Sequence, residues 1–301
     1  MKKYMPRIVD KVLKNKLEYM GAVLIEGCKW CGKSTTARQF SKSSIEFQDP
    51  DKKLQYDKIN QTKPSLFLEG EKPRLFDEWQ MYPVVWDSIR MDVDKTGLKG
   101  QYILTGSARP KEDSVMHTGT GRITKLLMRP MSLFETNESN GKVSLKDIVE
   151  KKEISGVSNL DFNGLISAMI RGGWPEALNV DEDNKYKIAK DYIKSLLTEE
   201  IKTLDGAERN PRKIMAVLQS ISRNISTSVS KATILDDVKN EFTNELSRPT
   251  LDDYINALEK LYILEYVPAT NLNLRSKTPL RVTPKLELVD PSLVIASLDL
   301  Q

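Results

Sequence analysis

One short segment near the N-terminus constrains the fold of this 301-residue chain more than any other feature. Residues 27–34 have the spacing G-x-x-x-x-G-K-S, an apolar run at 22–25 precedes them, and a helix-forming stretch at 36–40 follows. A strand, a loop and a helix in this order are typical of the phosphate-binding P-loop. The glycines let the backbone turn successive N–H groups toward one anion, and the helix N-terminus adds a positive dipole end. We therefore expect an α/β fold built on a parallel sheet.

The residues of this loop have distinct expected roles. Lys33 would reach the β- and γ-phosphates of a nucleotide, and Ser34 would supply a hydroxyl to Mg²⁺. The other positions would surround the phosphates with backbone. The expected nucleotide-binding residues are Gly27, Cys28, Lys29, Trp30, Cys31, Gly32, Lys33, Ser34 and Thr35.

Both cysteines of the chain lie in this loop with C-x-x-C spacing. A zinc site would need two further ligands, and His117 is the only histidine. A thioredoxin-like redox motif would not need a glycine, a lysine and a serine directly behind it, so we do not expect a redox function. A helix N-terminus lowers the pKa of a thiol, which leaves oxidative inactivation open.

Two adjacent acids end the next apolar segment, residues 74–80, which read Arg-Leu-Phe-Asp-Glu-Trp-Gln. This is a Walker B pattern. Asp77 would hold Mg²⁺ through water, and Glu78 would orient and polarise the attacking water. The second acid is unusual in small-molecule kinases, and the Asn-Lys-x-Asp motif of GTPases is absent downstream. We therefore expect ATP and Mg²⁺ as ligands, with a solvated strand end as the alternative interpretation.

A strand at 101–108 is expected to lie beside the Walker B strand, with its polar end near the γ-phosphate. Thr105 or Ser107 would contact the attacking water or the phosphate there, and an ordinary strand-end turn is the alternative. A glycine-rich loop at 117–122 then leads into a strand at 123–128. Arg122 is the first candidate for a positive charge that stabilises phosphoryl transfer, within a subunit or across an interface. Arg109 and Arg129 are the alternatives.

These segments resemble the bacterial and archaeal AAA-type ATPases that carry a C-terminal domain of unknown function. The resemblance rests on Gly-Cys-Lys-Trp-Cys-Gly-Lys-Ser, Leu-Phe-Asp-Glu-Trp-Gln, Ile-Leu-Thr-Gly-Ser-Ala, His-Thr-Gly-Thr-Gly-Arg-Ile and Met-Arg-Pro-Met-Ser-Leu. It continues in Arg-Gly-Gly-Trp-Pro-Glu-Ala-Leu at 171–178 and Asp-Pro-Ser-Leu at 290–293, so it spans nearly the whole chain. It implies an ASCE-type P-loop domain that binds ATP, followed by a helical lid and a winged helix.

The sequence departs from this family at two points. Family members commonly have proline at position 28, so the C-x-x-C pair looks incidental. They more often have threonine at position 34, where serine should be functionally equivalent. Family members usually continue beyond Asp-Pro-Ser-Leu into a segment that resembles restriction endonucleases. This sequence stops at Gln301 and shows no acid-x-Lys active-site constellation, which argues against nuclease activity and leaves open whether the chain is truncated before such a segment.

We expect four regions: a P-loop ATPase core at 1–136, a polar linker or insertion at 137–160, a helical lid at 161–205 and a winged-helix domain at 206–301. In related signal-transduction ATPases, a Gly-x-Pro in the lid lies against adenine. By that resemblance Pro175 would contact adenine, and an ordinary helix-ending turn is the alternative.

The winged-helix domain would consist of helices at 212–225, 231–240 and 250–262, followed by strands at 263–267 and 281–289. The exposed face of the third helix carries mostly acids, so sequence-specific DNA reading through it is improbable. These residues are Asp252, Asp253, Asn256, Glu259 and Lys260. The wing carries four bases that would touch phosphates without reading sequence, although a solvated hairpin is favoured. The wing bases are Arg275, Lys277, Arg281 and Lys285.

The net charge of +4 is small, which argues against a general polyanion-binding surface. Two cysteines and the lack of a long apolar run favour a cytoplasmic protein with no membrane segment. Our first interpretation is an ATP-hydrolysing switch that couples nucleotide state to the winged helix and to an unassigned macromolecular partner, with homo-oligomerisation left open. The alternative is a non-hydrolysing regulator or adaptor that contacts DNA or protein. Glu78 favours hydrolysis.

Overall fold

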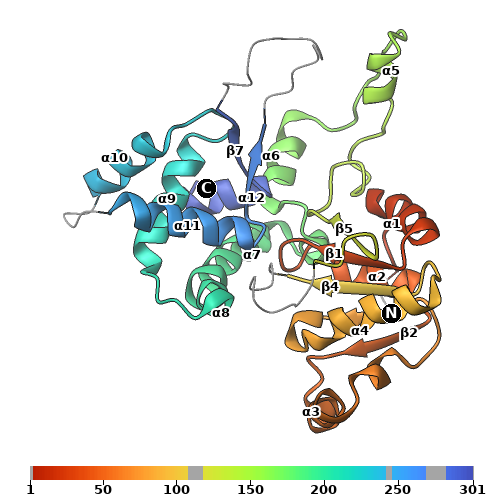
Figure 1. Ribbon diagram of the computed structural model, residues 1–301. Helices are drawn as coiled ribbons and strands as arrows, with labels where there is room; N and C mark the ends of the chain where they lie inside the picture. Colours follow the sequence, from red (N-terminus) through yellow and green to blue (C-terminus); the bar gives the residue numbers. More distant parts are fainter. Residues whose placement is uncertain (1–2, 108–117, 242–245, 269–282, 301) are drawn as a thin grey trace, which may run out of the picture. The chain divides into compact units, whose positions relative to one another are not determined.

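The computed structural model of the chain describes residues 3–107, 118–241, 246–268 and 283–300 (Figure 1). The chain divides into two compact units, Met1–Met131 and Ser132–Gln301. No helix among the described residues is long and apolar enough to cross a membrane.

The first unit is built on a parallel sheet of five strands with helices around it, and this confirms the predicted α/β fold. Across the sheet the strands stand in the order β2 (Ser43–Glu46), β3 (Arg74–Asp77), β4 (Tyr102–Gly106), β1 (Ala22–Glu26) and β5 (Ile123–Leu127). The helices are α1 (Ile8–Tyr19), α2 (Lys33–Phe40), α3 (Lys53–Thr62) and α4 (Val84–Thr96). Strand β4 lies between the P-loop strand β1 and the Walker B strand β3, the order expected of an ASCE-type sheet.

The core of this unit fixes the strand that carries the Walker B acids. The ring of Phe47 packs against those of Tyr56, Phe67 and Tyr82 with centroids 4.8–5.4 Å apart, and it stacks on Phe76 of β3 at 6.1 Å. All five side chains are buried. Burial of each apolar ring contributes about 1.5–3 kcal/mol, so the end of β3 is held firmly.

The register of the strands decides which loops meet. Ala22 at the start of β1 pairs with Tyr102 at the start of β4 and with Ile123 at the start of β5. Asp77, the last residue of β3, pairs with Thr105 of β4. The residues that follow β1, β3 and β4 therefore share the carboxyl edge of the sheet, and the residues that precede β5 lie at the opposite, amino edge.

The second unit is mainly helical. Its elements are α5 (Leu145–Val149), α6 (Phe162–Arg171), α7 (Glu182–Ser195), α8 (Ile201–Asp205), α9 (Pro211–Arg223), α10 (Lys231–Glu241), α11 (Arg248–Lys260), β6 (Leu264–Val267), β7 (Lys285–Leu288) and α12 (Pro291–Ser297). Strands β6 and β7 pair in antiparallel fashion. The three helices α9 to α11 followed by two strands match the element order expected at 212–289, whereas the winged-helix assignment stays a prediction. Helix α12 packs on α6, α7 and α9, so the segments expected as lid and winged helix share one unit.

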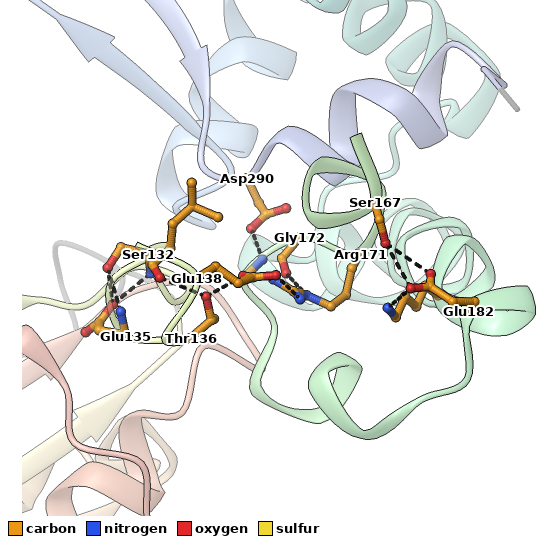
Figure 2. A network of polar contacts seen from close by, with 12 residues as sticks. Ser132, Glu135, Thr136, Glu138, Ser167, Arg171, Gly172, Glu182 and Asp290 are labelled. Carbon is orange, nitrogen blue, oxygen red and sulfur yellow. Dashed lines mark hydrogen bonds and ion pairs between the residues drawn. The ribbon is translucent and has the colours of Figure 1, made fainter. Parts of the chain in front are cut away.

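Polar contacts among Glu138, Arg171, Gly173 and Asp290 join distant segments of this second unit (Figure 2). The Arg171 guanidinium donates to both carboxylate oxygens of Glu138, at 2.8 and 2.7 Å. This pairing lowers the pKa of Glu138. The N–H of Gly173 donates to Asp290 Oδ2 at 2.8 Å.

Trp174 adds to the same junction. Its ring is fully buried, stacks on Tyr192 with centroids 4.5 Å apart, and its Nε1 donates to Ser292 Oγ at 3.0 Å. A Cβ at Gly172 would collide with the Asp290 carboxylate, and its φ is +72°, so both space and conformation require glycine. The motifs at 171–178 and 290–293 thus have a shared structural role.

Candidate functional site

The P-loop follows β1 and leads directly into α2. Gly27 has a φ of +151°, and a Cβ there would collide with the carbonyl oxygen of Met128. Gly32 has a φ of +100° and is the N-cap of α2. Trp30, between them, has a φ of +66° and is 57% exposed. The two glycines are therefore required where the loop turns, as the spacing predicted.

Lys33 is the first residue of α2 and is only 5% exposed. Its Nζ donates to the carbonyl oxygens of Gly27 and Cys28, at 2.9 and 2.8 Å. The ammonium group is thus folded over the loop, where it is largely removed from water. A bound phosphate would offer it charged oxygens in place of neutral carbonyls, and charge-assisted hydrogen bonds are the stronger kind.

Ser34 and Asp77 meet at the carboxyl edge of the sheet. The Ser34 Oγ donates to Asp77 Oδ1 at 2.6 Å, and the Thr105 hydroxyl donates to the same oxygen. Arg38 of α2 lies 3.3 Å from Asp77 Oδ2. A hydroxyl and a carboxylate in contact are hard oxygen donors that suit Mg²⁺, which proteins usually hold with one or two carboxylates plus phosphate and water. Within the described ranges no cluster of three or more acidic, histidine or cysteine side chains offers another metal site.

Glu78, directly after β3, has a left-handed backbone with a φ of +55°. Its Oε2 accepts hydrogen bonds from Gln80 Nε2 at 2.5 Å and from Ser107 Oγ at 3.3 Å, and its N–H donates to Thr105 Oγ1 at 3.3 Å. Of the two sensor candidates, Thr105 therefore contacts Asp77, and Ser107 contacts the carboxylate of Glu78. Gln80 ends the string Leu-Phe-Asp-Glu-Trp-Gln that carries the family resemblance, but the sequence alone assigned it no role.

Arg122 lies at the amino edge of the sheet, because its carbonyl oxygen accepts from the N–H of Ala22 at the start of β1. Its guanidinium pairs with Asp94 of α4, with Nε and Oδ1 2.5 Å apart. The five residues of β1 span roughly 16 Å between the two edges of the sheet, so Arg122 does not lie where it could stabilise phosphoryl transfer within its own subunit. Action across a subunit interface stays a prediction. Arg129 follows β5, at the carboxyl edge, whereas Arg109 and His117 lie outside the described residues.

Arg7 is a site residue that sequence analysis missed. It is the N-cap of α1 and is 8% exposed, and its guanidinium donates to the carbonyl oxygens of Cys31 and Arg129 at 2.7 Å each. These contacts link the P-loop to the end of β5. An arginine before a helix carries no motif. The only general signal was that residues 1–50 hold ten basic and five acidic residues.

The remaining predicted residues belong to the second unit. Pro175 begins a 3₁₀ turn, Pro175–Asn179, and its contact with adenine stays a prediction. On α11, Asp252 pairs with Lys231 at 2.6 Å and Asp253 pairs with Arg209 at 2.8 Å, so these acids have structural partners. Lys285 begins β7 and is exposed. The wing bases Arg275, Lys277 and Arg281 lie outside the described residues.

Both parts of the chain match family models. Residues 20–137 match an AAA domain, and residues 163–301 match a domain of unknown function, DUF8612. No curated protein matches the sequence.

Among solved structures, one has a similar fold over nearly the whole chain. A Walker-type ATPase of Pyrococcus abyssi is 15% identical, with a TM-score of 0.57, and the match covers 98% of this chain and 96% of that chain. ORC1 of Aeropyrum pernix, solved in complex with DNA, is 13% identical with a TM-score of 0.32, and the match covers 99% and 94%. The replication initiator DnaA, bound to AMPPCP and single-stranded DNA, is 15% identical with a TM-score of 0.35, and the match covers 83% and 86%. The chain thus joins an AAA domain at residues 20–137 to a domain of unknown function at residues 163–301.

Proposed function

We propose that this protein binds Mg-ATP and hydrolyses it, and that the nucleotide state of the first unit controls the second. The observation that carries the proposal is the contact between Ser34 and Asp77, 2.6 Å apart, with Glu78 next in the chain. A phosphate-binding loop needs the glycines and Lys33 alone. The acid pair beside the loop adds what hydrolysis requires, namely donors for a metal ion and a carboxylate that can polarise water.

Each residue would have a defined task. Lys33 would exchange the carbonyls of Gly27 and Cys28 for phosphate oxygens. Ser34 would ligate Mg²⁺ directly and Asp77 would hold it through water, and the ion would neutralise charge on the phosphates. Glu78 would orient the attacking water and accept its proton.

The second unit would be the responding element. Its helices α9 to α11 with the β6–β7 pair favour a winged helix, and helix α12 packs this part onto α6 and α7. A change at α6 or α7 would therefore reach the proposed winged helix through direct packing.

A non-hydrolysing regulator is the second candidate, and one observation favours it. Glu78 Oε2 accepts from both Gln80 and Ser107, so this carboxylate oxygen is already engaged in hydrogen bonds within the protein. If these hydrogen bonds persist when nucleotide binds, ATP would be retained intact.

One experiment separates the two candidates. Single-turnover release of phosphate and the affinity for a fluorescent ATP analogue are measured for wild type, Lys33→Ala and Glu78→Gln. Hydrolysis by wild type that is lost in Glu78→Gln with affinity retained would support the switch. Equal affinity in wild type and Lys33→Ala would contradict the P-loop assignment. Tight binding with no phosphate release from wild type would support the regulator.

A further inference from the structure

One segment of the second unit carries apolar side chains that the rest of the chain does not cover. Sequence analysis expected a polar linker or insertion at 137–160, yet five apolar side chains between 143 and 157 are more than half exposed. They are Val143, Leu145, Ile148, Val149 and Val157. We call residues 140–157 the arm.

Helix α5 lies in the arm, which projects away from the other helices of its unit (Figure 1). Leu145, Ile148 and Val149 stand at positions i, i+3 and i+4, so they share one face of this helix. The helix has 5 residues, and isolated helices shorter than about 12–15 residues are marginal in water. Among the described elements, none packs extensively against α5. Its apolar face therefore lacks the packing that would stabilise so short a helix.

Local hydrogen bonds nevertheless hold the arm in shape. Asn140 Nδ2 donates to the carbonyl oxygen of Val157 at 2.7 Å and closes the base of the arm. The Ser144 hydroxyl accepts from the N–H of Asp147 at 3.1 Å and caps α5. A surface that is organised in advance loses less conformational freedom when a partner binds.

Helix α6 has a second uncovered apolar face. Phe162 is 75% exposed, and the three other apolar residues of this face are about 40% exposed. With Phe162 they stand at i, i+3, i+4 and i+7, and they are Leu165, Ile166 and Met169. Helices α7 and α12 pack on α6, and its buried residues Ala168 and Arg171 lie on the other side. A stripe of this kind is typical of a helix that packs against another helix.

We propose that the arm of one copy of this chain docks on the α6 face of a second copy, and that the reciprocal contact forms at the same time. Lys142 and Lys146 are exposed beside the apolar residues of the arm. Asp161 caps α6, and Glu182 accepts from the Ser167 hydroxyl of α6 at 3.0 Å (Figure 2). An arm on α6 therefore brings opposite charges together, whereas two α6 faces in contact would bring acids together.

The exposed area agrees with a reciprocal contact. An aliphatic side chain presents about 60–120 Å² and an aromatic ring about 150–250 Å², so with the exposed fractions the arm and the α6 face together offer roughly 600 Å² per copy. Two contacts related by a two-fold axis would bury about 1,200 Å², the lower end of the range for stable, specific interfaces. One contact alone would bury about half of this, which is typical of crystal packing. We therefore expect a dimer with a dissociation constant near about 1 μM.

The oligomeric state of the full chain tests this proposal independently of nucleotide binding. In sedimentation velocity between about 0.1 and 50 μM, a range around that dissociation constant, the mass should rise from the 34.2 kDa of one chain to twice that value. Leu145→Ser and Phe162→Ser each remove the same kind of contact twice per dimer, so each should raise the dissociation constant at least tenfold. Leu54→Ser is the matched control, because Leu54 is 86% exposed on α3 of the first unit, and it should dimerise like wild type.

Cross-linking tests which surfaces meet. A mixture of Leu145→Cys and Phe162→Cys proteins, treated with a short bis-maleimide, should give a covalent dimer that joins positions 145 and 162. Wild type measures the background, since Cys28 and Cys31 are buried. Wild type that stays monomeric over the whole range overturns the proposal, and so does a dimer that Leu145→Ser does not weaken. Phe162→Cys protein that cross-links alone as well as the mixture does would mean that the α6 faces meet each other, which also overturns it.

Discussion

Replacement of Arg7 by alanine tests whether the P-loop depends on a side chain outside it. The guanidinium donates to the carbonyls of Cys31 and Arg129 at 2.7 Å each. Hydrogen bonds from a charged donor contribute about 1.5–3 kcal/mol each, and water that enters the vacated space will restore part of the loss. Two such bonds are lost and water restores part of their contribution. We therefore expect Arg7→Ala to lower the free energy of unfolding by about 2–4 kcal/mol.

Loss of these contacts should also weaken nucleotide binding, because the loop would lose its link to the end of β5. The affinity for Mg-ATP should fall at least tenfold. Arg7→Lys keeps the charge but lacks the fork that reaches two carbonyls at once, so its effects should be intermediate. Urea unfolding followed by circular dichroism and titration with a fluorescent ATP analogue measure both quantities.

Lys11→Ala is the matched control, since Lys11 is an exposed base on the same helix, α1. Surface substitutions of this kind change stability by about 0.5 kcal/mol or less. If Arg7→Ala unfolds at the same urea concentration as Lys11→Ala and binds ATP equally well, the structural link we describe does not stabilise the loop.

Three further predictions concern the rate of hydrolysis and the second unit. Gln80→Ala should raise the single-turnover rate about tenfold with ATP affinity unchanged, because one charge-assisted hydrogen bond of roughly 1.5 kcal/mol no longer holds Glu78; a slower variant would mean that Gln80 positions this acid. Arg122→Ala should reduce hydrolysis much more than binding if the arginine acts across an interface, because the charge it would stabilise exists only in the transition state. Mixing it with Glu78→Gln protein should then restore activity, and a mixture as inactive as its components, with turnover independent of concentration, would exclude that role. Binding of random-sequence DNA through the four wing bases should weaken with salt at a log–log slope near −3.6, about −0.9 per phosphate; a sequence-specific footprint lost on mutation of Asp252 would contradict our interpretation of α11.

The sequence was sufficient to predict the local structure wherever function requires particular residues at a fixed spacing. The P-loop, the Walker B strand and the strand between them were all predicted, because each combines an apolar run with polar residues at a strand end. The contact of Thr105 with Asp77 follows from the parallel pairing of β3 and β4, which sequence analysis expected in outline.

Residues whose role depends on the path of the chain could not be placed in this way. Arg122 follows the sensor strand closely in sequence, yet the chain returns to the amino edge of the sheet before β5 begins, and spacing does not reveal this. Arg7 reaches the loop from 24 residues away and its other contact from 122 residues away, so no local pattern marks it. Helices α12 and α6, which pack together, are likewise far apart in the chain, so no local pattern predicts their contact.

The junction in the second unit also sets an order of events during synthesis. Gly173 and Asp290, which share a hydrogen bond, are 117 residues apart in the chain. Ribosomes add about 5–20 residues per second, so Asp290 emerges roughly 6–23 s after its partner. Until then the indole of Trp174 lacks the Ser292 hydroxyl that accepts its hydrogen bond in the finished fold. The first unit, whose sheet is complete once β5 has been made, can fold during that interval. A nascent chain stalled before Asp290 would thus combine a finished first unit with a second unit in which Trp174 still lacks its hydrogen-bond acceptor.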